Sequence, residues 1–234
     1  MIENTDIEAY LFVSKNYYGI YLFDKKKSNN LYKKETEFKN DNNNLDLNFL
    51  NEFINDNIFK IEKQIGKFIK NIFLIIESEN VFNINLGIKK KNYNKTVNKT
   101  YLENIVTEAK DLFKENYPDY KIIHIILSNY YANGLNYTSL SNDLQTDNLC
   151  LELKFISIHY NLTYEISQIL QKYQIKVIQY LSGIYIKSFF ENENLEFSEK
   201  ISKILEGQND KEISVVEKNL KKKGFFEKFF QLFS

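Results

Sequence analysis

The clearest indication of the fold class is the run Ile72-Phe73-Leu74-Ile75-Ile76. Five consecutive apolar residues between Asn71 and Glu77 are typical of a short strand that is buried on both faces. In the preceding segment, Leu45–Ile69, the apolar residues recur every three or four positions, which predicts an amphipathic helix. A helix that leads into a buried strand indicates an α/β domain.

Two short apolar stretches precede this helix, at Tyr10–Val13 and Gly19–Phe23. The polar triplet Ser14-Lys15-Asn16 separates them, so the pattern fits either a hairpin or one long bent strand. Leu31–Phe38 could supply a further strand. The N-terminal part of the chain is therefore predicted to be β-structure.

After the buried strand, predicted strands and helices alternate along the chain. Val81–Leu86 partly alternates and suits a half-exposed strand. Thr100 and Glu103 fit a capping box at the start of a helix that ends before Pro118. Lys121–Leu127 is a second run with the composition of a buried strand.

The remaining elements follow the same alternation. Asn133-Gly134 signals a tight turn. We then expect a strand, a helix, a strand and a short helix, in that order, at Leu149–His159, Tyr164–Tyr173, Lys176–Leu181 and Gly183–Phe190. The charged segment 191–219 is predicted to be a linker with some helix. The fold class is therefore mixed α/β.

The amino-acid composition limits the classes of function and the cellular compartment that we expect. The chain has 234 residues, of which 43% are hydrophobic and 26% charged, and its formal net charge is zero. All basic residues are lysine, and without the planar fork of arginine we expect no nucleic-acid partner. Cys150 is the only cysteine, so no intramolecular disulfide can form. No signal peptide or run of ~20 apolar residues is apparent, and we expect a reducing cytoplasm.

No set of residues stands out as catalytic or metal-binding. His124 and His159 both lie in predicted strands with apolar surroundings, which favours satisfied structural histidines over metal ligands. No glycine-rich phosphate-binding motif is present, and no pair of carboxylates is set in apolar surroundings. We therefore predict that the protein is not an enzyme and has no metal, no cofactor and no catalytic residue.

The segment 220–234 is the most informative. At ~100° per residue its apolar side chains fall within an arc of about 160°, and polar side chains occupy the rest. An aromatic face beside a lysine cluster is typical of a helix that lies in a membrane interface. We predict a membrane-targeting amphipathic helix with these membrane-binding residues: Lys221, Lys222, Lys223, Phe225, Phe226, Lys228, Phe229, Phe230, Leu232 and Phe233.

A helix with this pattern could instead dock on the chain's own core or on a protein partner. The position after a charged linker, the lysines and the density of phenylalanine favour the membrane. Each buried Phe contributes roughly 1.5–3 kcal/mol before ordering costs, and each lysine adds about 1 kcal/mol on an anionic leaflet. The expected partner is therefore an anionic membrane surface.

The middle of the chain contains a more specific succession of segments. Pro118-Asp119-Tyr120-Lys121-Ile122-Ile123-His124-Ile125-Ile126 is followed by Tyr130, by Asn133-Gly134, and by Leu149-x-Leu151-Glu152 leading into Phe155-Ile156-Ser157-Ile158. This order, over Ile72–Ser188, is similar to the FtsA family, actin-like proteins that anchor the bacterial division ring to the inner membrane. The charged linker and terminal helix also resemble that family.

The resemblance implies half of an actin-like, ribonuclease H-like fold. It places the first subdomain at 1–78 and 145–190, and a strand-helix-strand-strand insert (an SHS2 domain) at 79–144, before the linker and the helix. In the family this insert contacts later division proteins and neighbouring copies. The chain is accordingly expected to be a peripheral adaptor at the cytoplasmic face of the inner membrane.

Two features of the family have no counterpart here. Phe12 stands about where the first phosphate loop should begin with Asp, and no glycine follows in that loop. The chain enters its linker near Glu191, where the second half of an actin-like fold should start. ATP binding is therefore not carried over, and direct docking of FtsZ, which belongs to the second half, is left open.

The alternative is an actin-fold assembly platform of a pilus or secretion system, in the manner of PilM. Such platforms usually recruit a cytoplasmic peptide of a transmembrane partner and lack a terminal amphipathic anchor. The phenylalanine-rich segment 220–234 therefore distinguishes the two expectations.

Overall fold

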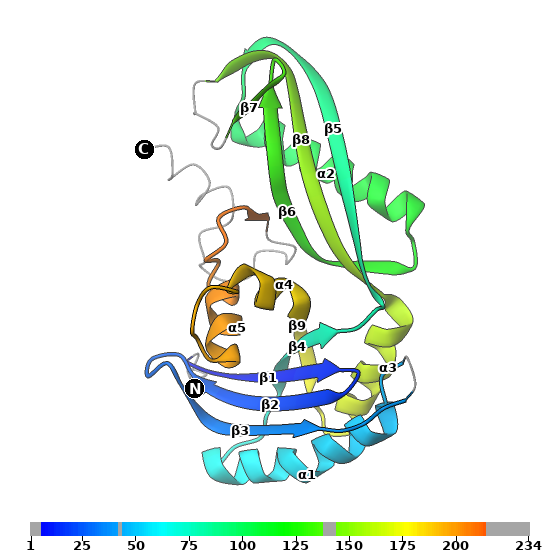
Figure 1. Cartoon of the computed structure of the whole chain (residues 1–234), viewed down its shortest axis with the longest axis vertical. Coiled ribbons are helices and arrows are strands. Elements are labelled where there is room, and N and C mark those ends of the chain that lie inside the picture. Colours follow the sequence, from blue (N-terminus) through cyan, green and yellow to red (C-terminus); the bar gives the residue numbers. More distant parts are fainter. Residues whose placement is uncertain (1–5, 42–43, 138–143, 214–234) are drawn as a thin grey trace. The chain divides into compact units, whose positions relative to one another are not determined.

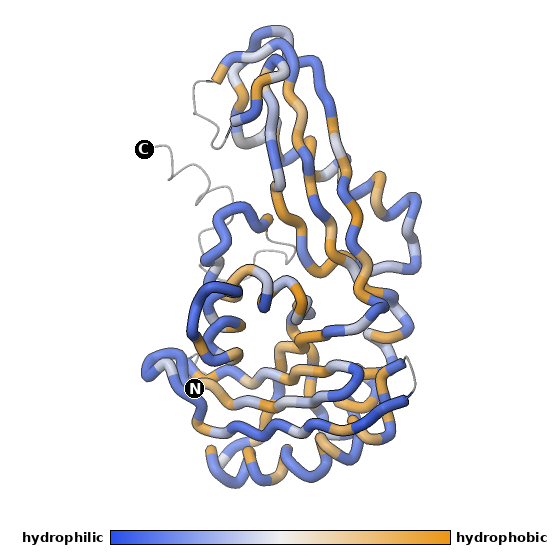
Figure 2. Tube along the Cα trace, viewed as in Figure 1, coloured by the Kyte–Doolittle hydropathy of each residue, from blue (hydrophilic) through white to orange (hydrophobic). Residues whose placement is uncertain are grey.

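The computed structural model describes residues 6–41, 44–137 and 144–213. The chain divides into two compact units (Figure 1). Of the described residues, the first unit holds those up to Val81 together with His159–Gln208, and the second holds Phe82–Ile158 together with residues 209–213. Hydrophobic residues are concentrated in the central strands, whereas β3 (Asn29–Glu37) and the connecting loops are largely hydrophilic (Figure 2).

A five-stranded mixed sheet forms the centre of the first unit. Its strand order is β3-β2-β1-β4-β9. The first three strands are antiparallel, and β4 and β9 run parallel to β1. The strands are β1 (Ile7–Ser14), β2 (Tyr17–Asp24), β3 (Asn29–Glu37), β4 (Asn71–Glu77) and β9 (Lys176–Ser182). The N-terminal stretches thus form a hairpin, because Val13 pairs with Tyr18 across the turn.

Helix α1 (Leu47–Ile65) forms where the apolar spacing predicts it. The Asp46 carboxylate caps it by accepting a hydrogen bond of 2.9 Å from the Phe49 amide. Gly66 ends it with φ of 68°, a left-handed conformation that glycine adopts without steric cost. The apolar stripe, including Ile54 and Ile58, is buried.

The helices cover both faces of this sheet. Tyr18 packs on Phe49 of α1, with ring centroids 5.7 Å apart. Tyr21 faces the opposite side and packs on Phe197 of α5 at 6.4 Å, because residues separated by an odd number of positions point to opposite faces of a strand. Helix α3 contacts α1 and β9, and helix α4 contacts α5 and β4. The bounds are α3 Tyr160–Gln171, α4 Gly183–Phe189 and α5 Phe197–Leu205.

The second unit is a sheet with one long helix. Its strand order is β10-β6-β8-β5, and β7 pairs with β6. Helix α2 packs on this sheet through a core that includes Ala109, Phe113 and Phe155. The elements are β5 (Val81–Thr96), α2 (Lys99–Asn116), β6 (Tyr120–Ala132), β7 (Leu135–Tyr137), β8 (Gln145–His159) and β10 (Glu212–Ile213). Asn133 and Gly134 both have positive φ, as the tight turn between β6 and β7 requires.

The fold class expected from the sequence is confirmed. The first unit is a mixed α/β sheet of order β3-β2-β1-β4-β9 with helices on both faces, which is consistent with the expected half of an actin-like fold. The strand-helix-strand arrangement of the second unit is inserted between β4 and β9. Both units have an apolar core of their own.

One helix start was wrongly predicted. The side chain of Asn98, not that of Thr100, caps α2, because it accepts a hydrogen bond of 2.9 Å from the Tyr101 amide. Thr100 therefore lies inside the first turn and cannot form the expected capping box with Glu103. Asparagine is among the best N-cap residues, which explains why the helix begins sooner than expected.

The segment 145–158 was expected to return to the first subdomain, and the structure differs. The whole of this segment lies in β8, which hydrogen-bonds between β6 and β5 of the second unit. Leu149, Leu151 and Leu153 point into the core of that unit. The chain re-enters the first unit only at His159.

The charged linker predicted at 191–219 also differs over its described part. Ser198, Ile201 and Ile204 of α5 are buried in the first unit. The chain then joins the second unit, where Glu212 and Ile213 pair with Ile126 and Ile125 of β6. The helix expected within this segment is α5, whose burial in the first unit was not predicted. Strand β10 was not predicted, because two residues are too short to show a strand pattern.

Candidate functional site

The carboxyl edge of the first sheet is the place where an α/β fold of this kind would hold a ligand. The parallel strands β1, β4 and β9 all end there. Ser14 is the register partner of Glu77, and Ile76 is the partner of Ser182. A phosphate or a metal bound by the sheet would lie beside these strand ends.

The side chain of Phe12 fills this edge. It is 2% exposed, and its ring centroid lies 4.9 Å from that of Phe197 and 5.4 Å from that of Tyr17. Both contacts are edge-to-face, the arrangement that aromatic pairs prefer. Strands β1 and β2 and helix α5 are therefore joined through one phenylalanine ring.

Gly183, the first residue of α4, closes the edge from the other side. A Cβ atom at this position would come within 2.7 Å of Cε2 of Phe12 and 3.2 Å of Cβ of Glu77. No side chain can be accommodated at those distances without a shift of the neighbours. The backbone of α4 thus packs directly against the aromatic ring.

The charged groups at the edge pair with each other. Nζ of Lys187 lies 2.6 Å from Oε2 of Glu77 and 4.9 Å from the centroid of the Phe12 ring. The ammonium group thus combines an ion pair with a cation–π contact. In the described ranges, no group of three or more His, Cys, Asp or Glu residues is placed to hold a metal ion. The side chains at this edge are therefore engaged in aromatic packing and in one ion pair.

The two histidines have structural contacts. His159 caps α3, because its Nδ1 accepts a hydrogen bond of 3.2 Å from the Asn161 amide. His124 is fully buried, and its Nδ1 lies 2.5 Å from Oε1 of Glu212. The expectation of satisfied structural histidines is thus met, but no pattern in the sequence indicated the Glu212 contact.

Strand β10 fixes the point from which the C-terminal segment leaves the described part of the chain. Besides the His124–Glu212 contact, the Leu127 amide donates a hydrogen bond of 2.8 Å to the carbonyl of Lys211. The segment that follows Ile213 therefore starts from the β6 edge of the second unit. All ten predicted membrane-binding residues lie in 221–233, outside the described residues.

Among the residues that the structure describes, no helix has both the length and the hydrophobicity needed to cross a bilayer.

A shallow hollow of about 430 Å³ lies between α3 and β9, where Ser167 Oγ is 2.9 Å from the Tyr180 hydroxyl. Its lining is uncharged and consists of Tyr160, Asn161, Thr163, Tyr164, Ser167 and Tyr180.

No family model and no curated protein matches the chain, whereas several solved structures are similar to it, among them the following three. The cytoplasmic domain of EpsL, an inner membrane component of the type II secretion system of Vibrio cholerae, is 6% identical (TM-score 0.41; 77% of this chain and 58% of that chain are covered). The PilM–PilN type IV pilus biogenesis complex is 8% identical (0.48; 78% and 49%). A Bacteroides thetaiotaomicron protein of unknown function with an actin-like ATPase fold is 14% identical (0.33; 83% and 61%).

The chain spans about half to three fifths of the length of these three proteins. Identities and TM-scores this low assign neither a family nor a function. The actin-like description therefore rests on the strand order and on the position of the inserted unit.

Proposed function

We propose that this chain is a non-enzymatic assembly platform, which brings protein partners together at the cytoplasmic face of a membrane. The buried Phe12 ring supports the non-enzymatic part of this proposal. It stands where the actin-like resemblance would require the aspartate of a phosphate loop, and Gly183 packs against it within contact distance. A nucleotide phosphate could reach these strand ends only if the ring and α4 both moved.

The second unit provides the partner-binding surface in this proposal. One face of its sheet packs on α2, through residues such as Ile88 and Leu153. On the other face of β5, Asn83, Lys89 and Lys91 are exposed. A polar face on a well-packed sheet supports recognition of a soluble protein surface, since the rims of transient interfaces are polar.

Two kinds of assembly are candidates. A pilus or secretion platform is the kind to which PilM and EpsL belong. An FtsA-like division adaptor, which would link division proteins to the inner membrane, is favoured by the predicted amphipathic helix at 220–234. Both candidates share a half-actin-like core and peripheral membrane attachment.

Titration calorimetry of the full chain with ATP and Mg²⁺ tests the non-enzymatic part. We expect no heat of binding with ATP or ADP up to millimolar concentrations, because the Phe12 ring and the backbone of Gly183 fill the strand ends beside which a phosphate would lie. Micromolar binding of either nucleotide would overturn the proposal. Injection of each nucleotide into buffer alone provides the heat of dilution as the control.

Photo-crosslinking in the organism that encodes the chain separates the two assemblies. A crosslinking residue is placed at Lys89 or Lys91, and a matched control at Tyr164 of the first unit, which is also exposed. Adducts with pilus or secretion components identify a pilus or secretion platform, and adducts with division proteins identify a division adaptor. If neither class is captured from either β5 position, the second unit is not the partner-binding surface.

A further inference from the structure

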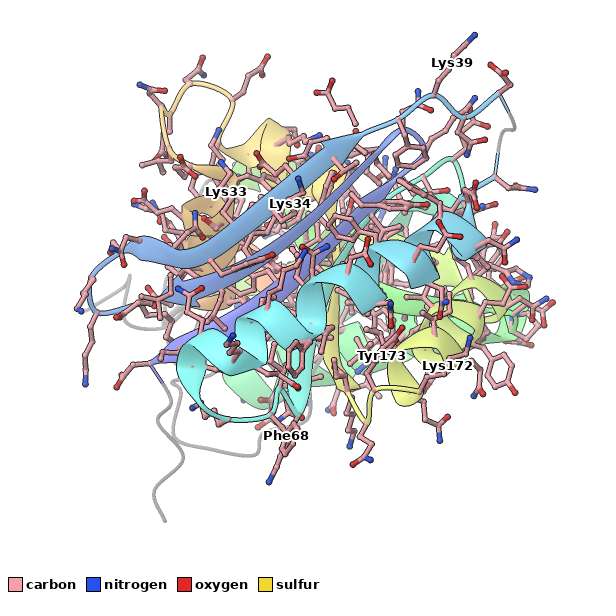
Figure 3. The ribbon with its side chains drawn as sticks, turned by 90° about the horizontal axis from the view of Figure 1, so that it is seen from below. Lys33, Lys34, Lys39, Phe68, Lys172 and Tyr173 are labelled. Carbon is pink, nitrogen blue, oxygen red and sulfur yellow. The ribbon has the colours of Figure 1, made fainter. Side chains whose placement is uncertain are left out.

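An exposed basic and aromatic surface lies at the end of α1. We define the α1-end patch as Phe59, Lys60, Lys63, Lys67, Phe68 and Lys70. Phe59 is 72% exposed and Phe68 is 79% exposed, and all four lysines are exposed. Figure 3 shows Phe68 projecting from the first unit where the chain leaves α1 for β4. Most phenylalanine side chains in folded proteins are buried, so two exposed rings so close in sequence need an explanation.

The core of the first unit does not use either ring. The buried stripe of α1 is complete with Leu50, Ile54, Ile58 and Ile61, together with Phe53 and Asn57. At ~100° per residue, Phe59 points away from this stripe, and Lys63 follows it one turn later on the same outer face. Ile69, the residue after Phe68, is the one that turns inward, and it is 6% exposed.

The charge of the patch is strongly one-sided. Between positions 59 and 70 there are four lysines and one acidic residue, Glu62. The Glu62 carboxylate is occupied, since it accepts a hydrogen bond of 3.0 Å from the Ile69 amide. Over the described ranges, no carboxylate lies within ion-pair distance of Lys60, Lys63, Lys67 or Lys70, whereas Lys25, Lys90 and Lys187 each have an acidic partner.

Helix stability accounts for only part of this arrangement. A lysine in the last turn, such as Lys63, is favourable because it faces the negative end of the helix dipole. That effect does not require Lys67 and Lys70, which lie beyond the helix, and it gives no reason for exposed aromatic rings. Exposed phenylalanine framed by unpaired lysine has the chemistry of a contact with an anionic lipid surface.

We infer that the α1-end patch is a second membrane contact, with which the first unit lies on an anionic bilayer. Phe59 and Phe68 enter the boundary between headgroups and acyl chains, and the lysines lie among lipid phosphates. This inference rests on the membrane attachment in the proposed function, but it uses residues outside the predicted amphipathic helix. Lysine, which is a point charge, suits a diffuse layer of phosphates better than the bidentate recognition of a phosphopeptide.

Vesicle co-sedimentation with four forms of the full chain tests the inference. The forms are the wild type, a patch variant (Phe59→Ser with Phe68→Ser), a tail variant (Phe226→Ser with Phe230→Ser) and the combination. Vesicles of phosphatidylcholine mixed with phosphatidylglycerol are compared with phosphatidylcholine alone. We expect the patch variant to bind anionic vesicles about tenfold more weakly or worse, and the combination to lose binding altogether.

The controls separate the patch from general surface effects. Leu135→Ser with Tyr164→Ser removes two apolar groups that are 65% and 64% exposed, and should leave binding unchanged. Lys63→Glu with Lys67→Glu should weaken binding to anionic vesicles only. Far-UV circular dichroism of each form confirms that the exposed substitutions leave the fold intact.

Each outcome distinguishes the inference from the proposed function. If the patch variant binds like the wild type while the tail variant loses binding, the second contact is refuted and the proposed function stands. If no form binds either kind of vesicle, membrane attachment fails and the second contact fails with it. A patch variant that changes only the self-association of the chain, measured by sedimentation velocity, would assign the patch to a contact between copies and overturn the inference.

Discussion

At the scale of single residues, Phe12 decides what the first unit can do. A phenylalanine at the end of β1 places a ring, and no carboxylate, among Tyr17, Phe197 and the backbone of Gly183. The ring gives apolar and aromatic contact, and Lys187 and Glu77 pair over it. The edge that could have held a ligand is thereby used for packing.

Phe12→Ala should therefore be costly to stability. Removing a buried ring leaves a cavity, and we expect the free energy of unfolding of the first unit to fall by about 3–5 kcal/mol. Urea titration followed by circular dichroism measures this loss of unfolding free energy. Phe68→Ala is the matched control, and because its ring is 79% exposed we expect no change beyond about 0.5 kcal/mol. Equal effects of the two substitutions would contradict the packing role of Phe12.

Gly183→Ala tests the same contact from the helix side. The added methyl group would lie 2.7 Å from a ring carbon of Phe12, and we expect a destabilisation of about 1–3 kcal/mol through overpacking. At Gly87, in contrast, an added Cβ meets no atom within 4 Å, so Gly87→Ala should be neutral or slightly stabilising. Comparison of the urea midpoints of the two variants gives the answer, and a stable Gly183→Ala variant would argue against the close packing.

At the scale of elements, apolar periodicity predicted most of the structure. The spacing in Leu45–Ile69 and the run Ile72–Ile76 correspond to α1 and β4, because their side chains meet the core with the periods of a helix and a buried strand. The open choice at Ser14–Asn16 was settled as a hairpin by pairing between β1 and β2, a nonlocal contact that no pattern in one strand reveals.

The errors occurred where distant partners decide the structure. Strand β8 was assigned to the wrong unit, since its apolar residues fit the core of either sheet and only hydrogen bonding with β6 and β5 distinguishes them. Strand β10 is two residues long and depends on β6 for its existence. For the candidate site, the sequence predicted only that Phe12 stands where the resemblance requires an aspartate. The contact of Phe12 with Phe197 was not predicted, because α5 lies in a segment predicted to be a linker.

The attachment of β10 leads to a prediction about local opening. Glu212→Ala removes the carboxylate that contacts the buried His124, and we expect β10 to detach from β6 more often. The Leu127 amide, which donates to the carbonyl of Lys211, should then exchange its hydrogen about tenfold faster or more, corresponding to roughly 1–3 kcal/mol. NMR-detected hydrogen exchange measures this.

Two controls accompany that measurement. The Asn133 amide donates to the carbonyl of Asn148, away from β10, and its exchange should not change. Glu206→Ala removes a carboxylate upstream of β10, in the first unit, and should leave Leu127 unaffected. Unchanged exchange at Leu127 in the Glu212→Ala variant would show that the His124 contact does not hold the strand.

At the scale of the whole molecule, buried tyrosines link stability to alkaline pH. Burial raises the pKa of Tyr10, Tyr18 and Tyr21 well above the ordinary value, and raises the pKa of Tyr130 in the second unit to about 12. These hydroxyls keep their protons in the folded chain, whereas in the unfolded chain they ionise near pH 10. Ionisation therefore stabilises the unfolded state, and stability that is constant below about pH 10 should fall above it.

Urea midpoints measured from neutral pH to about pH 12 check this. Lysines titrate over the same range, so the variant Tyr18→Phe provides the matched comparison. It loses the 2.7 Å hydrogen bond to the carbonyl of Asp46 and should be less stable at neutral pH, but its stability should fall less steeply above about pH 10. Identical slopes for the two chains would show that Tyr18 ionises equally easily in both states.

Two units with separate cores, a closed carboxyl edge and a predicted lipid-binding segment are the features on which the proposed assembly platform rests. The amphipathic segment 220–234 lies outside the described residues, so its role depends on experiment. We expect this segment to provide the main attachment to the membrane and the α1-end patch to add to it.

Co-sedimentation of the full chain with anionic vesicles, compared with Phe226→Glu combined with Phe230→Glu, tests membrane recruitment most directly. We expect that the wild-type chain pellets with the vesicles, that salt weakens this binding without abolishing it, and that the substituted chain pellets far less. If wild-type and substituted chains bind equally, or if neither binds, the segment is not a membrane anchor and recruitment of the platform to a membrane by its C-terminal segment is contradicted.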